Sequence, residues 1–419
     1  MKKYRQVLVW AVLLIGITGL FLYRNEYVKL RSTFEMFVVV DSSSGFSDRN
    51  CLVLNETGAD DGMVDALGRP RPLWTPVGRF HVYSAFAAIS GGRSLVKAIA
   101  VGKAEDSTRS FRCHIWYDFK DVILSSTEGE FAIASERIDT ADEHFYELTC
   151  SVVEEVKGRP YMLVLVDPAD GRKYFVPVFR PPPKADGFSA ALCVYPDLTG
   201  LPKTFLVEFL AFHQVVGFTD VLLYDFGLHY GLLDKAVRMA SASRSFRSFS
   251  VLNWNLPYLD SRVAKFLLQK DCLYRTADRA AVTVALGWNE YLVPKNAAKL
   301  DRLFANHTVL KNTKIDLRTR LCCTDKKNTK GSEKSWPRVL RKTECAAFPT
   351  DSFVIINPTM SPPGQTARTT VEKGTIFFYD NCYNYGSVKA TFNPTALDFL
   401  GELMSNKILR LWKSGKFFS

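Results

Sequence analysis

The sequence lacks the cysteine spacing of a zinc site and the signatures of nucleic-acid-binding modules. None of its nine cysteines belongs to a Cys-x-x-Cys pair, so a zinc finger is not indicated. Eleven basic and three acidic residues between Lys311 and Lys342 supply most of the net charge of +11. Nucleic-acid-binding domains carry their basic residues along a recognisable module. We therefore expect no nucleic-acid partner.

The chain contains enough hydrophobic residues to form buried cores. Hydrophobic residues make up 47% of the 419 residues and aromatic residues 13%. Disordered chains contain far fewer. A chain of this length exceeds one ordinary core, which predicts two or three folded units.

The N-terminus contains a long apolar run. Residues 7–23 are uncharged, and about 1.5 Å of helix rise per residue lets such a run cross a thin bilayer. The run ends in Leu20 to Tyr23, whereas a cleaved signal peptide ends in small residues. We expect residues 1–6 to be a cytoplasmic tail and residues 7–23 an uncleaved transmembrane signal anchor. A secreted form, cleaved after the run, is the alternative.

Two glycosylation acceptor sequences begin at Asn55 and Asn306, and all the cysteines follow the anchor. Both features suit a secretory lumen, where disulfides form. Because nine is an odd number, at least one thiol is left over. The adjacent Cys322 and Cys323 are predicted to have separate partners or to be buried free thiols.

The remaining chain divides by composition. Residues 24–75 are rich in Ser, Gly and acidic residues and predict a stem. Residues 76–180 contain short Val-, Ile- and aromatic-rich runs at a spacing typical of a small all-β sandwich. Pro181 to Pro183 cannot continue a helix or a central strand, so a second domain is predicted over 181–419. The expected strands of the first domain are FHVYSAF, LVKAIAV, FRCHIWY, FYELTCSVV, YMLVLV and KYFVPV.

Beyond the prolines, apolar runs alternate with helical patterns. Strands are predicted near 190–195, 221–225, 249–254 and 281–286, with helices over 204–216, ending at Gly217, and 261–278. This βαβ pattern predicts a mostly parallel, Rossmann-like sheet, with ligands bound at the carboxyl ends of its strands.

Several fragments in this region resemble glycosyltransferase family 92 in order and spacing, over about Tyr83 to Asn384. The resemblance implies a GT-A-like fold, a nucleotide-sugar donor, commonly UDP-galactose, and inverting transfer of galactose to a glycan or glycoprotein acceptor, usually with Mn²⁺. It also implies a single-pass type II protein of the Golgi or another secretory-pathway membrane, with the catalytic domain in the lumen. The fragments are Cys193-Val194-Tyr195-Pro196, Glu208 with Phe212-His213 and Gly217, Val221 to Asp225, Asn253-Trp254 with Pro257, Asp271-Cys272 with Arg275, and Glu290 to Pro294.

The sequence departs from the family at two elements. The family's Asp-x-Asp followed by Glu appears here as Gly287-Trp288-Asn289-Glu290, and its later His-Tyr-Arg as Phe378-Tyr379-Asp380. Asn289 and Glu290 still offer oxygen ligands, but with less charge. Mn²⁺ is therefore expected to bind weakly or to be dispensable.

The expected site residues follow from the resemblance and from strand ends. Glu290 and Asp225 are the candidate catalytic residues; Asp225 is alternatively a turn-capping acid, and Glu290 an acid that caps a loop-to-helix junction. Trp288 is a sugar-stacking or core residue, and the basic stretch is a donor-closing loop or simply solvated. Candidate nucleotide-sugar contacts are Tyr195, Tyr224, Asp225, Trp288, Asn289, Arg341 and Lys342, and candidate metal ligands are Asn289 and Glu290. Two functions stay open, a hexosyltransferase and an inactive glycan-binding or scaffolding relative.

Overall fold

The structure is a computed structural model. The predicted tail, the predicted anchor and most of the predicted stem lie outside the residues that it describes, which begin at residue 73. Within the described ranges, no helix combines the length and apolar character needed to cross a bilayer. Asn55, Asn306 and the three prolines also lie outside them. The described residues are 73–90, 93–119, 122–138, 142–152, 158–179, 186–196, 203–226, 237–240, 243–257, 260–304, 312–326, 336–349, 353–360, 374–386 and 389–414.

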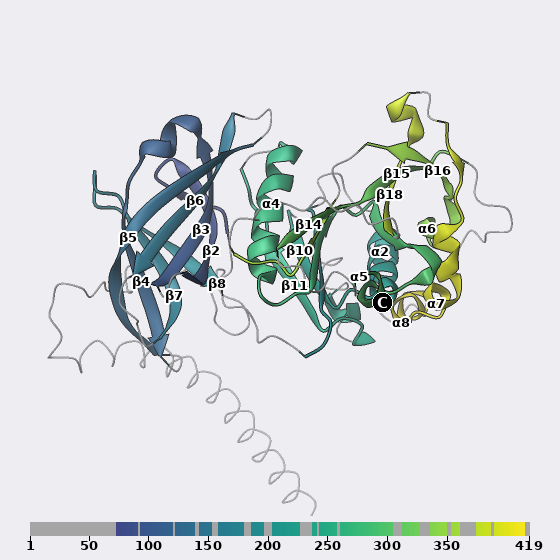
Figure 1. Cartoon of the computed structure of the whole chain (residues 1–419), viewed down its shortest axis with the longest axis horizontal. Helices are drawn as coiled ribbons and strands as arrows, with labels where there is room; N and C mark the ends of the chain where they lie inside the picture. The colour runs from purple at the N-terminus through teal and green to yellow at the C-terminus, as the bar shows by residue number, and fades with distance from the viewer. Residues whose placement is uncertain are drawn as a thin grey trace, which may run out of the picture.

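The first unit is a sheet that closes on itself (Figure 1). Its strand order is β1-β2-β3-β6-β5-β4-β7-β8, and β2 also pairs with β8, so seven strands form a closed barrel. Each expected strand lies largely within an observed one, but the 16-residue β5 was not expected, because its Ser, Glu and Gly residues weaken the apolar pattern. The strands are β1 (Thr75–Val77), β2 (Phe80–Ser90), β3 (Arg93–Lys103), β4 (Arg112–Phe119), β5 (Val122–Arg137), β6 (Glu143–Val152), β7 (Arg159–Val166) and β8 (Lys173–Phe179).

Alternating side chains of this sheet face two different cores. Val96 and Ala98 pack inside the closed sheet, whereas Ile99 and Val101 pack outward against the next unit. This is the period of two that a strand imposes. One face therefore stabilises the closed sheet, and the other attaches it to the rest of the chain.

The second unit is built on a six-stranded sheet of order β11-β10-β9-β12-β17-β14. The first four strands are parallel, and β17 and β14 run antiparallel to their neighbours. The helix α2 ends at Gly217, as expected, where φ is 114°. The elements are β9 (Ala190–Val194), α2 (Lys203–Val216), β10 (Asp220–Asp225), β11 (Ser248–Asn253), α4 (Ser261–Thr276), β12 (Val282–Leu286), β14 (Thr313–Asp316) and β17 (Phe353–Ile356).

A third, five-stranded sheet has the order β13-β18-β15-β16-β19. Only the β15–β18 pair is parallel. Its strands are β13 (Glu290–Pro294), β15 (Arg318–Cys323), β16 (Glu344–Phe348), β18 (Gly374–Asp380) and β19 (Thr391–Phe392). The short helices are η3 (Ala104–Thr108), η4 (Lys295–Ala297), α5 (Leu300–Phe304), α6 (Arg338–Arg341), η6 (Cys382–Tyr385), η7 (Thr395–Phe399), α7 (Leu400–Met404) and α8 (Lys407–Lys413).

The predicted fold class is wrong for the described residues. An α/β, GT-A-like domain with a mostly parallel, Rossmann-like sheet was expected after a small all-β sandwich and a transmembrane helix. The described chain is instead mostly strand, with a closed seven-stranded barrel, a mixed sheet and a mainly antiparallel sheet. The strand and helix alternation that suggested α/β covers only residues 190–286, and the described strands from Glu290 onward pair mainly antiparallel.

The helix α4 lies between the closed sheet and the six-stranded sheet (Figure 1). A fully buried ion pair marks this interface, with Arg275 Nε 2.6 Å from Asp271 Oδ2. The Asp271 carboxylate also accepts hydrogen bonds from Ser84 of β2 at 2.8 Å and from Tyr224 of β10 at 2.6 Å. One carboxylate thus joins both sheets to the helix.

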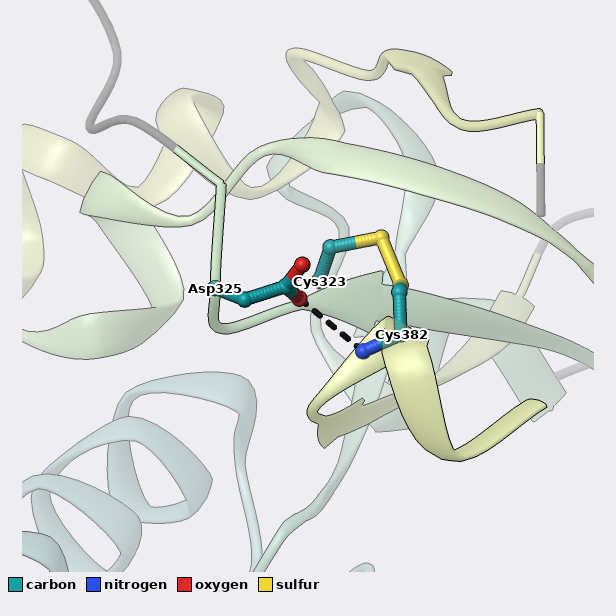
Figure 2. A group of neighbouring side chains, drawn as sticks. All are labelled: Cys323, Asp325 and Cys382. Carbon is teal, nitrogen blue, oxygen red and sulfur yellow. Dashed lines mark hydrogen bonds between the residues drawn. A yellow bond between two sulfur atoms is a disulfide. The ribbon is translucent and has the colours of Figure 1, made fainter. Parts of the chain in front are cut away.

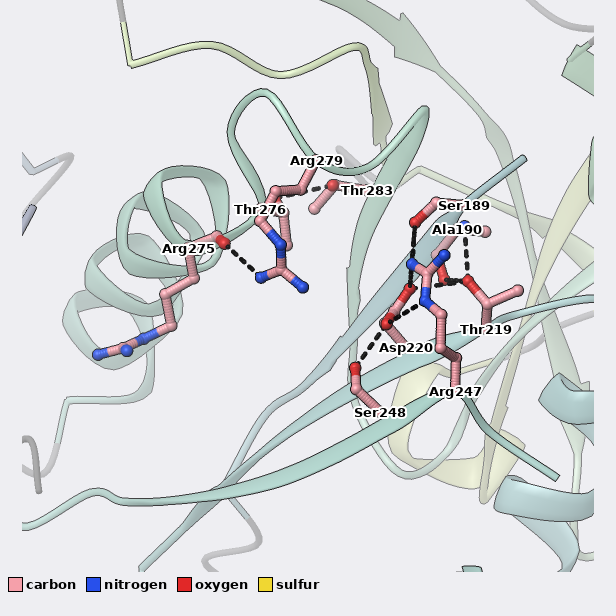
Figure 3. Close-up of polar contacts among 10 residues, drawn as sticks. All are labelled: Ser189, Ala190, Thr219, Asp220, Arg247, Ser248, Arg275, Thr276, Arg279 and Thr283. Atoms are coloured by element: carbon pink, nitrogen blue, oxygen red, sulfur yellow. Dashed lines mark hydrogen bonds and ion pairs between the residues drawn. The ribbon is translucent and has the colours of Figure 1, made fainter. Parts of the chain in front are cut away.

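A second polar cluster lies at the amino ends of the parallel strands (Figure 3). Asp220 accepts hydrogen bonds from Ser248, Arg247 and Thr219. Burial alone would raise the pKa of Asp220, but these three donors together lower it. The cluster fixes strand ends on the edge opposite to the one where ligands bind in parallel sheets.

Four disulfides connect the described cysteines: Cys113–Cys150, Cys193–Cys272, Cys322–Cys345 and Cys323–Cys382. The adjacent Cys322 and Cys323 therefore have separate partners, which confirms one of the two interpretations. The ninth cysteine, Cys51, lies outside the described residues. Gly129 permits the first bridge, because a Cβ there would lie 2.5 Å from Cys150 Sγ.

His213 makes the stability of α2 depend on pH. Its side chain is fully buried among aromatic rings, and Nδ1 donates to the Phe209 carbonyl at 2.9 Å. Burial lowers the pKa of His213 to about 3, while an unfolded histidine titrates near 6.5. The neutral folded form is fully favoured above pH 6.5, and this stability is lost as the pH falls toward 3. The expected loss is about 1.4 kcal/mol per pH unit.

Urea unfolding between pH 7 and 5 checks this expectation. His213→Phe keeps an aromatic ring in the site and does not titrate. We expect the variant to show a flatter pH dependence than the wild type over this window. Equal slopes for the two proteins would contradict the assignment, and the comparison cancels the contribution of other histidines.

Candidate functional site

The carboxyl ends of the parallel strands bring several predicted site residues to one edge of the six-stranded sheet. Asp225 ends β10, Tyr195 follows β9, and the turn from Gly287 follows β12. The backbone continues the parallel register at this edge, because Tyr195 N–H donates to the Leu286 carbonyl at 2.9 Å. This is the edge where parallel sheets bind ligands.

Glu290 closes the turn after β12. Its Oε2 accepts a hydrogen bond from Gly287 N–H at 2.7 Å, and its own N–H donates to the Gly287 carbonyl at 3.0 Å. The carboxylate is therefore held in one orientation by the turn. The contact caps a turn that leads into the strand β13, whereas a cap between a loop and a helix was the expected alternative, and the catalytic role stays a prediction.

The two elements that depart from the family motifs lie side by side. In the antiparallel β13–β18 pair, Glu290 is directly opposite Phe378. Tyr379 N–H donates to the Asn289 carbonyl at 2.8 Å. Directly opposed residues of an antiparallel pair project from the same face. Segments that are far apart in the sequence therefore form one local arrangement beside the sheet edge.

Tyr195 connects this arrangement to α4. Its hydroxyl accepts a hydrogen bond from Gln269 Nε2 at 2.9 Å, and Lys265 Nζ lies 5.3 Å from the ring centroid. Burial, and then the nearby Glu290 carboxylate, raise the pKa of Tyr195 well above its usual value of 10, against a smaller opposite effect of Gln269. The hydroxyl stays neutral, and its proton remains available for donation.

Lys265 and Gln269 were not predicted as site residues. They lie four positions apart on α4 and line a small pocket together with Thr283 and Ala285 of β12. The only sequence signal was their i, i+4 spacing on a helix that follows a parallel strand, which places them on one helix face. That spacing is common on any helix, so it did not single them out.

A divalent cation does not fit the residues at the turn. Gly287 has no side-chain ligand, Asn289 offers one neutral oxygen, and Phe378 offers none. The remaining carboxylate, Glu290, already accepts the Gly287 N–H. Manganese prefers a set of charged oxygen and imidazole ligands, and these four positions supply one charge.

Among the described residues, three side chains of metal-binding types lie close together: Cys323, Asp325 and Cys382 (Figure 2). The two sulfur atoms are bonded to each other, and a thiolate is the form that binds metal. Asp325 Oδ1 accepts a hydrogen bond from Cys382 N–H at 2.9 Å. The group therefore attaches η6 to β15 and is not a metal centre in this state.

Tyr224 and Trp288 have buried side chains. The Tyr224 hydroxyl donates to Asp271, on the α4 side of the sheet, away from the Gly287 turn. Trp288 is 5% exposed and its ring centroid lies 5.1 Å from that of Phe209. The structure therefore gives Trp288 the core environment that was its alternative interpretation. Donor contacts by either residue stay predictions.

The described residues of the basic stretch form strands and a short helix. These elements are β14, β15 and α6. Lys342 Nζ donates to the Lys326 carbonyl, and burial, followed by the neighbouring Arg341 charge, lowers the pKa of Lys342. Burial raises the pKa of Glu208, and the charge of Arg341 on α6 is one of the smaller effects that oppose this rise. These contacts join both residues to neighbours other than Glu290, and their predicted role at the diphosphate stays a prediction.

Arg338 is a further residue that the sequence did not single out. Its guanidinium stacks 4.0 Å from the Phe205 ring centroid, and Nη2 lies 3.5 Å from the Trp288 carbonyl. Its backbone N–H donates to Glu208 Oε2 at 2.8 Å. Burial raises the pKa of Glu208, although the Arg338 hydrogen bond and charge oppose this. The pair holds α6 and the Gly287 turn against α2.

The matches to known proteins are all to solved structures. No protein-family model and no curated protein matches the sequence. Among solved structures, the WbbM bifunctional glycosyltransferase in its apo form has a TM-score of 0.23 and 11% identity, over 35% of this chain and 26% of that one. S. aureus TarS 1-349 has a TM-score of 0.23 and 9% identity, over 41% of this chain and 47% of that one. This chain thus spans about a quarter and about half of the two structures, and the likeness carries no argument about its fold or activity.

Proposed function

We propose that the chain is a glycosyltransferase that transfers a hexose from a nucleotide sugar to a glycan acceptor without needing a divalent cation. The observation that supports it is the meeting of Gly287–Glu290 with Phe378–Asp380 beside the carboxyl ends of parallel strands. Both segments occupy positions of motifs in the resemblance to glycosyltransferase family 92, and they are about ninety residues apart in the sequence. Residues of one site must be close in space. These two segments are adjacent at the edge of the sheet where ligands bind.

The proposed reaction needs charge compensation and a base. The acceptor oxygen attacks the anomeric carbon, the bond to the diphosphate breaks, and its electron pair leaves with the nucleotide. A fixed cation must stabilise the departing diphosphate when no metal does, and Lys265 beside Tyr195 supports this role. Glu290 is the proposed carboxylate that receives the acceptor proton.

The finer assignments follow the resemblance. We propose UDP-galactose as the donor, transfer with inversion, and residence in the Golgi or another secretory compartment. The four disulfides support an oxidising compartment, since such bonds are rare in the cytosol.

Calorimetry on the full chain tests the donor. We expect UDP to bind with and without Mn²⁺, and galactose transfer or UDP-galactose hydrolysis to persist in EDTA. If UDP does not bind and the sugar nucleotide is neither transferred nor hydrolysed, the enzyme proposal fails. A strict requirement for Mn²⁺ would leave the transferase proposal standing and refute its metal-free form.

A second function is favoured by a separate observation. Gly287 and Asn289 occupy the positions of the family's Asp-x-Asp motif, Phe378 occupies the position of its later histidine, and Glu290 stabilises the turn. These changes suit a protein that binds glycans without transferring sugar. Glycan binding in the absence of any UDP binding would support this alternative.

Two substitutions of Glu290 separate its structural role from its chemical one. Glu290→Gln keeps an oxygen that accepts from Gly287 N–H but removes the charge, whereas Glu290→Ala removes both. We expect Glu290→Gln to lower the rate of transfer at least about 100-fold with little change in Tm, because a general base is lost. Glu290→Ala should in addition lower Tm. Full transfer activity in both variants would exclude Glu290 from the site.

A further inference from the structure

One face of the five-stranded sheet continues from Glu290 as a row of side chains, of which Leu321 is fully buried. Glu290 of β13 is opposite Phe378 of β18, Phe378 is in register with Leu321 of β15, and Leu321 is opposite Ala346 of β16. Residues in register across neighbouring strands share a face. The proposed catalytic carboxylate is therefore the first member of a row that extends away from the six-stranded sheet.

Three aromatic rings gather at this row: Phe378 within it, Phe348 two residues beyond Ala346 on β16, and Tyr385 from η6. Phe348 and Phe378 stack with centroids 5.6 Å apart, and the Tyr385 ring stands 5.1 Å from Phe348 and 6.2 Å from Phe378. Tyr385 is 38% exposed, which is unusual for a ring that packs on two others. We call Phe348, Phe378 and Tyr385 the aromatic platform.

Polar contacts hold the platform rigid. The Tyr385 hydroxyl donates to Asp380 Oδ2 at 2.7 Å, and Asp380 Oδ1 accepts from Asn381 N–H at 2.7 Å. The Cys323–Cys382 disulfide attaches η6, which carries Tyr385, to β15 (Figure 2). A ring fixed in this way loses little conformational entropy on binding a ligand.

We infer that the aromatic platform binds a pyranose ring of the glycan acceptor, an inference that rests on the proposed function. Aromatic faces pack against the C–H face of a sugar, and a few polar groups at the rim fix its orientation. The Asp380 carboxylate and the Tyr385 hydroxyl form such a rim. The platform thus offers both kinds of contact that a neutral sugar needs.

Charge distinguishes the acceptor from the donor as the ligand. The carboxylates of Glu290 and Asp380 flank the platform, on the β13 side and at the end of β18. Carboxylates repel the diphosphate of a nucleotide sugar and accept hydrogen bonds from sugar hydroxyls. A neutral glycan suits this surface, and a nucleotide does not.

Titration of the full chain with neutral oligosaccharides that end in galactose, mannose or N-acetylglucosamine tests the inference. Saturation-transfer NMR identifies a bound member, and calorimetry measures its Kd. Tyr385→Ala is expected to weaken binding at least tenfold, and Tyr385→Phe, which keeps the ring and loses the bond to Asp380, about threefold. Tyr383→Ala is the matched control, since Tyr383 is an aromatic residue of the same short helix that is 82% exposed, and it should bind as the wild type does.

Several outcomes separate this inference from the proposed function. If no oligosaccharide binds, or if Tyr385→Ala binds it unchanged, the inference is overturned whether or not UDP binds. If Tyr385→Ala instead weakens UDP binding, the platform belongs to the donor and the inference is wrong. Platform-dependent glycan binding without UDP binding supports the inference and refutes the transferase. Circular dichroism checks that each variant is folded, and Tyr385→Phe tests the platform should Tyr385→Ala unfold.

Discussion

Asp271→Asn is expected to lower the free energy of unfolding by about 3–5 kcal/mol. The substitution keeps the size of the side chain but leaves the Arg275 guanidinium, which is 2% exposed, without a counter-charge. Ser84 and Tyr224 donate to the two different oxygens of Asp271. In asparagine only one of these atoms is an oxygen that accepts, so one of the two hydrogen bonds is lost. Urea unfolding monitored by tryptophan fluorescence measures the loss.

An exposed ion pair on the same helix provides the control. Lys270 Nζ lies 2.6 Å from Glu136 Oε2, and Glu136 is 51% exposed. Lys270→Ala should cost less than about 1 kcal/mol, because water screens such pairs. Asp271→Leu combined with Arg275→Met should recover much of the stability lost in Asp271→Asn, since no buried charge remains unpaired. If Asp271→Asn and Lys270→Ala lower the free energy of unfolding equally, Arg275 must form another ion pair or be hydrated in the Asp271→Asn variant.

The sequence predicted the local elements where apolar residues repeat regularly. The runs at 190–195, 221–225 and 281–286 became β9, β10 and β12, and the helical pattern over 204–216 became α2. It did not predict the later strands, because they are short and carry charges, as at Arg318 and Arg320 of β15. Pairing between such strands depends on tertiary contacts, which no local pattern encodes.

The alternation of side chains along β10 determines which side of the sheet Tyr224 faces. Val221 and Leu223 of β10 pack in the core beside α2, whereas Leu222 and Tyr224 pack in the core beside α4. The position of Tyr224 near the end of a strand suggested a donor contact. Its hydroxyl donates to Asp271, because a buried carboxylate needs hydrogen-bond donors, and the contact with a sugar nucleotide stays a prediction.

The candidate site could be predicted only in part. The resemblance identified Glu290 and Phe378 separately, but nothing in the sequence indicated that β13 and β18 pair with these two residues opposed. The contribution of Lys265 and Gln269 depends on how α4 packs on β12, which is also a tertiary property. Sequence patterns therefore found the residues of the turn and missed its neighbours.

Restoring the family's motif is expected to create a manganese site. The variant Gly287→Asp/Asn289→Asp/Phe378→His adds two carboxylates and one imidazole beside Glu290. A Cβ at position 287 would lie 3.1 Å from Asn289 Oδ1 and 3.6 Å from Glu290 Oε2, so the new side chain requires small shifts of flexible groups only. We expect Mn²⁺ to bind at least 100-fold more tightly than in the wild type, a gain of about 2.7 kcal/mol. Calorimetry and the paramagnetic resonance of Mn²⁺ measure the change.

The position of the histidine makes this prediction specific. A control variant carries the same two aspartates, keeps Phe378, and places the histidine at Tyr383, which is exposed and outside the row that begins at Glu290. If position 378 faces the turn as the β13–β18 register requires, only the first variant gains the full affinity, because the imidazole must reach the ion together with the carboxylates. Equal affinities in the two variants would mean that the aspartates alone bind Mn²⁺. A folded first variant with no gain would show that Phe378 and the turn do not share a site, and the transferase proposal would lose its main support.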